Sequence, residues 1–332
     1  MTQEETASTT VMTTNPPASA PAYSASKRFL ALLEEMRPRQ WTKNFAVFIG
    51  LVFAQRLFEI VSLERASVAF VIFCLVSSTI YLLNDLLDLE KDRQHPTKRN
   101  RPLASGRLPI SWAIAGMGVI LLVCGGLTGI LYSFSIQGLD IFAQFGGATT
   151  LFAGIIVAYL ALMVCYSLRL KHVVLVDVFV IAAGFVLRIM AGAVVIPVSI
   201  SPWLYLVTCF LSLFLALSKR RHELVLLQGN ASNHRRILKE YSIPMLDQMI
   251  TITVTATVIS YSLYTAEGVT GNHRLIVTLP FVLYGMFRYL YLVYMKAEGG
   301  SPEEVLLRDR HMIGTVLLCT ILIMVVLYLL PQ

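Results

Sequence analysis

The chain has 332 residues, of which 56% are hydrophobic and only 14% are charged, and its mean hydropathy is +0.69. Soluble globular domains carry about 25% charged residues, so the composition excludes that class and indicates an integral membrane protein. The net charge of +7 comes mainly from basic residues between apolar segments. Such residues are typical of membrane topology signals, and nucleic acid is not an expected partner.

The N-terminal 26 residues differ from the rest of the chain. They are rich in Thr, Ser, Ala and Pro, and the first basic residue is Lys27. This composition cannot bury a core, so residues 1–26 are predicted to be a disordered tail. They have neither a basic n-region nor an apolar h-region, which excludes a signal peptide. Residues 27–332 are predicted to form one transmembrane domain.

Apolar segments of about the length that crosses a bilayer recur along this domain. We predict an all-α membrane bundle of nine transmembrane helices, at residues 44–60, 66–89, 109–133, 141–167, 173–196, 202–218, 243–266, 274–295 and 312–330. The first segment is short and is interrupted by Arg56 and Glu59. The five cysteines lie in or beside apolar segments without a C-x-x-C pair, so we expect no disulfides.

Basic residues cluster in alternate segments between the predicted helices. The clusters lie before the first helix, between helices two and three, four and five, six and seven, and eight and nine. By the positive-inside rule, these segments are cytoplasmic. The sequence therefore predicts a multi-pass protein of the inner (plasma) membrane, with a cytoplasmic N-terminus and an external C-terminus.

Three carboxylates lie at the end of the second predicted helix and just beyond it. Asp85, Asp88 and Asp92, preceded by Asn84, lie at i, i+3 and i+7 and share one face of a helix. Like charges this close repel each other unless a cation lies between them, and oxygen ligands favour Mg²⁺, which often completes its shell with substrate phosphates. The following loop contains three cations suited to phosphate, Arg93, Lys98 and Arg101. The alternative is an ordinary solvated helix end.

Two further polar clusters lie on the same predicted face of the membrane. The first comprises Tyr166, Lys171, Asp177 and Arg188. An arginine within an apolar helix normally faces a cavity or a partner. The alternatives are a carboxylate favoured by the helix dipole for Asp177 and a structural ion pair for Arg188.

The second polar cluster is Lys219, Arg220 and Arg221, which could equally anchor the helix end or contact anionic lipid headgroups. Lys43, in the N-terminal flank, is another candidate that could reach the site. No histidine has metal-ligand spacing with another His, Cys or carboxylate, so zinc is not expected.

These residues resemble the UbiA-type polyprenyl transferase superfamily. The resemblance covers residues 36–330 and rests on Asn84-Asp85-x-x-Asp88-x-x-x-Asp92 and on Tyr166, Lys171 and Asp177. It implies a UbiA-type bundle with a cytoplasmic-side active-site cavity, in which Mg²⁺ holds a diphosphate substrate between two aspartate motifs. The chain departs from the superfamily at its second motif, because Ile181 stands where a second aspartate is common.

Within the superfamily, one branch is more similar than the others. The basic loop from Asp92 to Gly106, Gly184-Phe185-x-x-Arg188 and Lys219-Arg220-Arg221-x-Glu223 resemble a phosphoribosyltransferase branch. The implied reaction transfers 5-phosphoribosyl from phosphoribosyl diphosphate (PRPP) to decaprenyl phosphate, releasing diphosphate. The product is the lipid-linked precursor of the cell-wall arabinose donor. The partners are then PRPP, the polyprenyl phosphate and the lipid bilayer, with a homo-oligomer left open.

The resemblance also implies a role for each candidate residue. Asp85, Asp88 and Asp92 would hold Mg²⁺, with Asn84 orienting them and Asp177 contributing from the facing helix. Tyr166, Lys171 and Arg188 would contact the diphosphate or ribose. The candidates for the 5-phosphate or the lipid phosphate are Arg93, Lys98, Arg101, Lys219, Arg220 and Arg221.

Three other functions compete with this interpretation. An aromatic prenyltransferase of the same superfamily would use a prenyl diphosphate and a quinone or heme precursor, but the missing second aspartate and the extra arginines count against it. A transporter would carry its polar residues near the membrane midplane, often within repeats. A structural subunit would leave the aspartate motif without a purpose.

Overall fold

The computed structural model describes residues 24–134, 140–227, 236–267, 273–296, 299–300, 305–306 and 308–330. Most of the predicted tail, residues 1–23, lies outside these ranges, and the first helix, α1 (Ala25–Glu35), begins at the end of that prediction. Every regular element in the described ranges is helical, which confirms the all-α prediction. All five cysteines lie in these ranges and are free thiols.

Eight helical segments are long and apolar enough to cross a membrane, and they correspond to the last eight predicted spans. The long helices in these segments are α3 (Ile60–Leu87), α5 (Ile110–Ser133), α7 (Ala148–Leu168), α8 (Val176–Val195), α9 (Pro202–Leu227), α10 (Ile243–Ala266), α11 (Leu279–Met295) and α13 (Arg310–Met324). Between or after them lie α4 (Leu89–Gln94), η2 (Lys98–Asn100), α6 (Asp140–Ala143), η3 (Leu170–His172), η4 (Arg236–Glu240), η5 (His273–Thr278) and η6 (Val325–Leu329).

The first predicted span, residues 44–60, is built differently. Its first ten residues fall on the end of a 3₁₀-helix, η1 (Pro38–Phe48, 11 residues), and on the five-residue α2 (Ile49–Phe53) that directly follows it, whereas residues 54–59 form turns before α3. Standard rises give the stretch from η1 through α2 a length of about 30 Å, close to the thickness of a hydrocarbon core. It starts beside Asp85 at the end of α3 and reaches Ile196 just beyond α8, where Arg56 Nη1 donates to the carbonyl at 3.3 Å. This stretch is not among the eight helical segments long and apolar enough to cross a membrane, so a ninth crossing stays a prediction.

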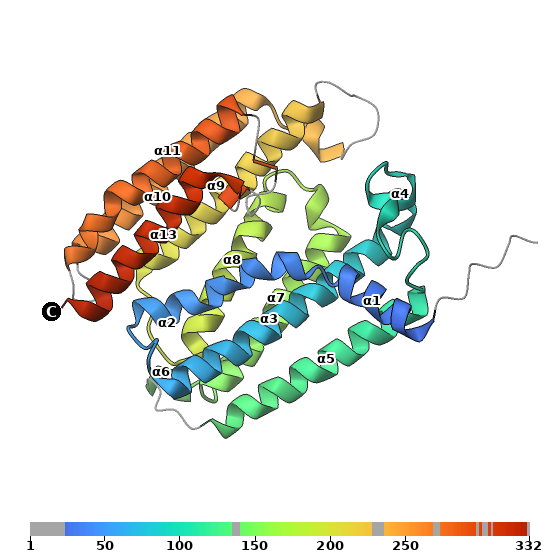
Figure 1. Ribbon diagram of the computed structural model, residues 1–332, viewed down its shortest axis with the longest axis horizontal. Helices are drawn as coiled ribbons and strands as arrows, with labels where there is room; N and C mark the ends of the chain where they lie inside the picture. The colour runs from blue at the N-terminus through green and yellow to red at the C-terminus, as the bar shows by residue number, and fades with distance from the viewer. Residues whose placement is uncertain are drawn as a thin grey trace, which may run out of the picture.

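The helices form two packed groups that meet at α8 (Figure 1). One apolar core joins η1 and α2 with α3, α5, α7 and the C-terminal half of α8. The other joins α9, α10, α11 and α13 with Val178 at the start of α8. Because α8 contributes to both cores, polar residues on it lie between the two groups.

A buried arginine connects the ends of α5 and α8 in the group of helices around α3. Arg65, near the start of α3, donates to the carbonyls of Val195 at 2.6 Å, Leu131 at 2.7 Å and Phe134 at 2.9 Å, and to Thr149 Oγ1 at 3.0 Å. These carbonyls lie at the C-terminal ends of α5 and α8, where the unpaired C=O groups carry partial negative charge. The guanidinium is therefore stabilised by helix ends.

The contact between η1 and α8 depends on a glycine. A Cβ atom on Gly192 would lie 1.9 Å from the carbonyl oxygen of Val47, which is part of the backbone. We therefore expect Gly192→Ala to push η1 away from α8 and to lower the free energy of unfolding by about 1–3 kcal/mol or more. Thermal unfolding of the detergent-purified protein measures this. Gly118→Ala is the matched control, because a Cβ there has no neighbour within 4 Å, and equal midpoints for the two variants would contradict the expectation.

Candidate active site

Two of the predicted metal ligands share one cation at the end of α3. Asp85 is buried in the last turn of α3, and Asp92 is buried on α4. Arg101 Nη1 donates to Asp85 Oδ1 at 3.0 Å and to Asp92 Oδ2 at 2.6 Å. Lys98 Nζ lies 3.7 Å from Asp92 Oδ1. The basic loop thus folds back onto the aspartate motif that precedes it.

The N-terminal flank completes this cluster. Arg37 Nη2 donates to both oxygens of Asp85, at 2.6 and 2.5 Å, and its guanidinium lies over the Tyr81 ring. Glu35 is only 2% exposed; its Oε2 accepts from the Leu103 backbone N–H at 3.4 Å, and its Oε1 has no hydrogen-bond partner in the described part of the chain. Burial and the adjacent Asp85 carboxylate raise the pKa of Glu35 to about 8. At neutral pH Glu35 therefore favours its protonated form, which can donate a hydrogen bond.

Asp88 turns to a different partner. Lys171 Nζ, on η3, donates to both oxygens of Asp88, at 3.1 and 2.8 Å. Lys171 is buried, whereas Asp88 is partly exposed. This ion pair ties the end of α3 to the segment that leads into α8, so the two aspartate motifs lie at the same end of the bundle.

Asp177 is the centre of a buried network that joins α8, α9 and Tyr241, the residue directly after η4. It is 0% exposed and accepts from Arg220 Nε at 2.6 Å and from the Tyr241 hydroxyl at 2.8 Å. Arg220 also donates to Glu223 at 2.5 Å and lies 3.5 Å from the Tyr166 hydroxyl. Burial and the hydrogen bond to Asp177 raise the pKa of Tyr241 to about 12, so this phenol remains a donor.

Arg188 lies deeper in the bundle, about 16 Å along α8 from Asp177 by the helical rise. Its guanidinium is buried and donates to Asn44 Oδ1 at 2.8 Å, the Tyr159 hydroxyl at 2.7 Å and the Gly184 carbonyl at 2.8 Å. These partners, from η1, α7 and α8, are all neutral. The charge of Arg188 is thus solvated by dipoles, an arrangement that leaves it able to attract an anion.

The other predicted residues lie around these networks. Asn84 is half-buried on α3 beside Asp85, Lys43 is half-buried on η1 before Asn44, and Lys219 is half-buried on α9 before Arg220. Arg93 is exposed and pairs with Glu90 at 2.7 Å.

Arg221 points to another part of the bundle from Arg220. Its Nε donates to Asp247 at 2.6 Å, and its guanidinium lies 4.2 Å from the centre of the Tyr294 ring. Of the two neighbouring arginines on α9, only Arg220 thus contacts Asp177, which follows from the 100° turn between successive helical residues.

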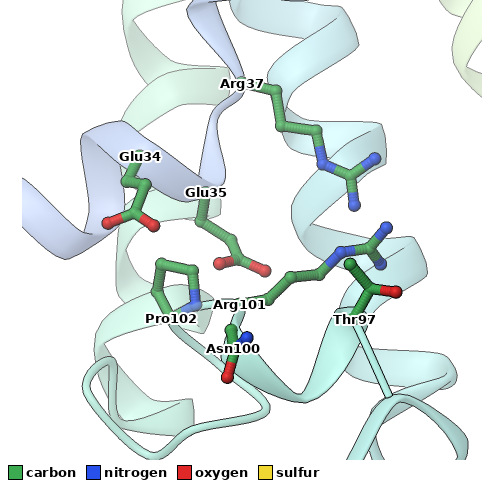
Figure 2. A pocket seen from close by; sticks show the side chains of 7 residues that line it. All are labelled: Glu34, Glu35, Arg37, Thr97, Asn100, Arg101 and Pro102. Atoms are coloured by element: carbon green, nitrogen blue, oxygen red, sulfur yellow. The ribbon is translucent and has the colours of Figure 1, made fainter. Parts of the chain in front are cut away.

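A pocket of about 270 Å³ opens beside the Asp85 cluster. Arg37, Thr97, Asn100 and Arg101 line it with hydrogen-bond donors, and Glu34, Glu35 and Pro102 complete its wall. Figure 2 shows Arg37 and Arg101 entering from opposite sides, with their guanidinium groups near each other. Both arginines therefore border the pocket as well as the carboxylates.

The three aspartates predicted to bind the metal do not all point to one position. Among the described residues, no group of three or more His, Cys, Asp or Glu is placed to hold a metal ion, because Asp88 faces Lys171. Asp85 and Asp92 do converge, since each places an oxygen within 3.0 Å of the same Arg101 nitrogen. Mg²⁺ commonly needs only one or two carboxylates and keeps several waters, so this pair fits the ion.

Glu35 and Tyr241 contact these networks but were not singled out in the sequence-based prediction, and Arg37 and Glu223 appeared there only as parts of candidate segments, without a role of their own. Arg37 and Glu35 come from a flank that could equally anchor the membrane interface. Tyr241 follows a long charged segment without a motif. The sequence carried one signal that could have identified the Arg220–Glu223 ion pair, because Glu223 lies about one helical turn after Arg220.

Membrane helices, a carboxylate pair and converging cations together define a membrane protein whose site suits a phosphorylated ligand. Comparison with known proteins is more specific. The chain belongs to the UbiA prenyltransferase family, which matches residues 44–303.

Relatives extend the match over most of the chain. A protein of Corynebacterium glutamicum named decaprenyl-phosphate phosphoribosyltransferase is 34% identical over 91% of this chain and 88% of its own length. One of the same name from Mycobacterium tuberculosis is 33% identical over 84% of this chain and 88% of its own. The solved structure of a UbiA homologue from Archaeoglobus fulgidus, bound to DMAPP and Mg²⁺, has a TM-score of 0.64 at 16% identity, covering 90% of this chain and all of that one. This structural likeness confirms the UbiA-type fold.

Proposed function

We propose that this protein transfers 5-phosphoribosyl from PRPP to decaprenyl phosphate and releases diphosphate. The observation that carries the proposal is the match, at 31–34% identity over 84–91% of the chain, to phosphoribosyltransferases of that name. The cations of the site support it, because PRPP carries a diphosphate and a 5-phosphate and the acceptor carries another phosphate.

The carboxylate end of the bundle is assigned to the diphosphate. Asp85 and Asp92 would hold Mg²⁺, whose chemistry when bound is to neutralise the charge that develops on a departing diphosphate. Lys171 is linked to this cluster by its hydrogen bond to Asp88, the third aspartate of the motif. Its ammonium can turn to a diphosphate oxygen, because three rotatable donors sit on a flexible stem.

Cations around the cluster are assigned to the other phosphates. Arg101 and Lys98 contact the Asp92 carboxylate, and Arg220 contacts Asp177 on the helix that follows the Lys171 segment. Arg188 and Tyr159 lie deeper between η1, α7 and α8, where a ribose or diphosphate group would meet a buried donor pair. These assignments use charge and hydrogen-bond donors, which recognise phosphate oxygens.

The acceptor requires little proton chemistry. A lipid phosphate is already an anion at neutral pH, so its oxygen can attack C1 of the ribose without a dedicated general base. Attack from the face opposite the diphosphate forms the new C1–O bond as the C1–diphosphate bond breaks, and the configuration at C1 inverts. The residues of the site therefore orient two anions and stabilise the leaving group.

The protein is a multi-pass membrane protein, and its exposed apolar side chains, including Leu122 and Phe287, face outward. We place it in the plasma membrane with the Asp85 end of the bundle in the cytosol, where the basic loops lie. PRPP would then enter from the cytosol and the prenyl tail from the bilayer.

The test is diphosphate release by the purified protein in detergent with Mg²⁺ and PRPP, with and without decaprenyl phosphate. Release that requires the lipid phosphate supports the proposal. Release only from a polyprenyl diphosphate with an aromatic acceptor would contradict it and would return the protein to the aromatic prenyltransferases.

A further inference from the structure

We infer that Arg37 and Arg101 are exchangeable counter-ions of the acidic site. They neutralise Asp85 and Asp92 until a phosphate group of the substrate takes over their guanidinium groups and leaves the carboxylates for a divalent cation. This inference rests on the proposed function, and it adds that metal binding and phosphate binding favour each other.

The first observation is the way in which the charges are paired. Two guanidinium groups contact Asp85, at 2.5 Å for Arg37 and 3.0 Å for Arg101, and Arg101 also contacts Asp92 at 2.6 Å. A cation that approaches these carboxylates alone must displace charge-assisted hydrogen bonds, which are stronger than neutral ones. Binding of the free metal is therefore opposed by the side chains of the protein itself.

The second observation is the difference in exposure between the partners. The Asp85 and Asp92 side chains are 2% and 5% exposed, whereas those of Arg37 and Arg101 are 27% and 29% exposed. The carboxylates are thus held in place, and the guanidinium groups can turn without breaking a core. The Asp177–Arg220 pair differs, since both side chains are at most 2% exposed, and we expect it to persist.

The third observation is the destination for the released arginines. Both line the 270 Å³ pocket together with Thr97 and Asn100, and Figure 2 shows them at its edge. Glu35 also lines it, and its buried Oε1 has no hydrogen-bond partner in the described part of the chain. A phosphate group in this pocket would accept from both arginines. Because the diphosphate is assigned to the metal and the carboxylates, the 5-phosphate of a phosphoribosyl substrate is the group that would occupy the arginines.

The consequence is thermodynamic coupling. If a phosphate occupies the arginines, the carboxylates attract a divalent cation more strongly, and by linkage the bound cation strengthens phosphate binding by the same factor. Such coupling typically amounts to about 5- to 150-fold in affinity.

The experiment measures Mn²⁺ binding by electron paramagnetic resonance on the full-length protein in detergent, with and without ribose 5-phosphate. This probe has one phosphate and no diphosphate, and the Mn²⁺ that it binds in buffer is measured separately and subtracted. We expect ribose 5-phosphate to tighten Mn²⁺ binding to the unaltered protein by at least about fivefold. In Arg101→Gln we expect Mn²⁺ alone to bind more tightly than to the unaltered protein, with the effect of ribose 5-phosphate reduced.

Arg37→Gln is an independent second variant, in which we also expect tighter binding of Mn²⁺ alone and a smaller effect of ribose 5-phosphate. Arg99→Gln is the matched control, because Arg99 lies on the same loop with an exposed side chain, and it should behave like the unaltered protein. Thermal unfolding confirms that each variant is folded. Weaker or unchanged Mn²⁺ binding in both site variants, or no effect of ribose 5-phosphate on the unaltered protein, would overturn the inference. Diphosphate release tests the proposed function separately, so the two can fail independently.

Discussion

Asp85→Asn is expected to lower the rate of lipid-dependent diphosphate release at least about 100-fold, the size seen when one preorganised electrostatic group is removed. The substitution removes one of the two carboxylates that converge on a single cation position. It also leaves Arg37 and Arg101 with one fewer counter-charge. The loss is measured as the rate of diphosphate release at saturating PRPP and decaprenyl phosphate.

Glu90→Gln is the matched control for this variant. Glu90 lies on the neighbouring α4 helix, but its carboxylate is exposed and pairs with Arg93. It should keep near-normal turnover, because exposed pairs contribute little. Folding of both variants is checked by thermal unfolding. Normal turnover by a folded Asp85→Asn protein would exclude Asp85 from the catalytic site.

Asp177→Ala is expected to destabilise the fold by about 3–5 kcal/mol, because it leaves a buried guanidinium without its fully buried carboxylate partner and with only the partly exposed Glu223 carboxylate. Asp177 is 0% exposed and Arg220 is 1% exposed. Tyr241 would also lose its acceptor. Unfolding of the detergent-purified protein measures the loss, and Glu90→Ala, which removes an exposed carboxylate, should change stability by at most about 1 kcal/mol.

A double substitution separates stability from function at this pair. Asp177→Leu with Arg220→Met replaces two buried charges by apolar groups, which is often neutral or stabilising relative to the ion pair. We expect it to recover much of the lost stability and none of the turnover. Recovery of both stability and turnover in the double variant would show that the pair is only structural. If the Asp177→Ala protein were as stable as the unaltered protein, the buried placement of the pair would be contradicted.

The pairing of the aspartates could be predicted only in part. Periodicity places Asp85, Asp88 and Asp92 on one helical face, and the structure does put Asp85 and Asp92 on one cation. Asp88 instead meets Lys171, 83 residues later in the chain. No local pattern encodes a partner at that separation, because the packing of α3 against the segment before α8 decides it.

The first predicted membrane segment illustrates a second limit. Hydropathy identified residues 44–60 as apolar, but it carries no information on helix type. A 3₁₀-helix forms there, and close approach to α8 at Gly192 holds it against the bundle.

The sequence by itself determined the membrane class, the all-α architecture, the last eight spans and the superfamily resemblance, because hydropathy and motif spacing are local properties of the chain. Only the tertiary structure decided which cation neutralises which carboxylate. It joined Arg37 to Asp85 and Arg220, rather than Arg221, to Asp177. The physical reason is that ion pairs between helices depend on helix rotation and depth, which are set by packing across the whole bundle.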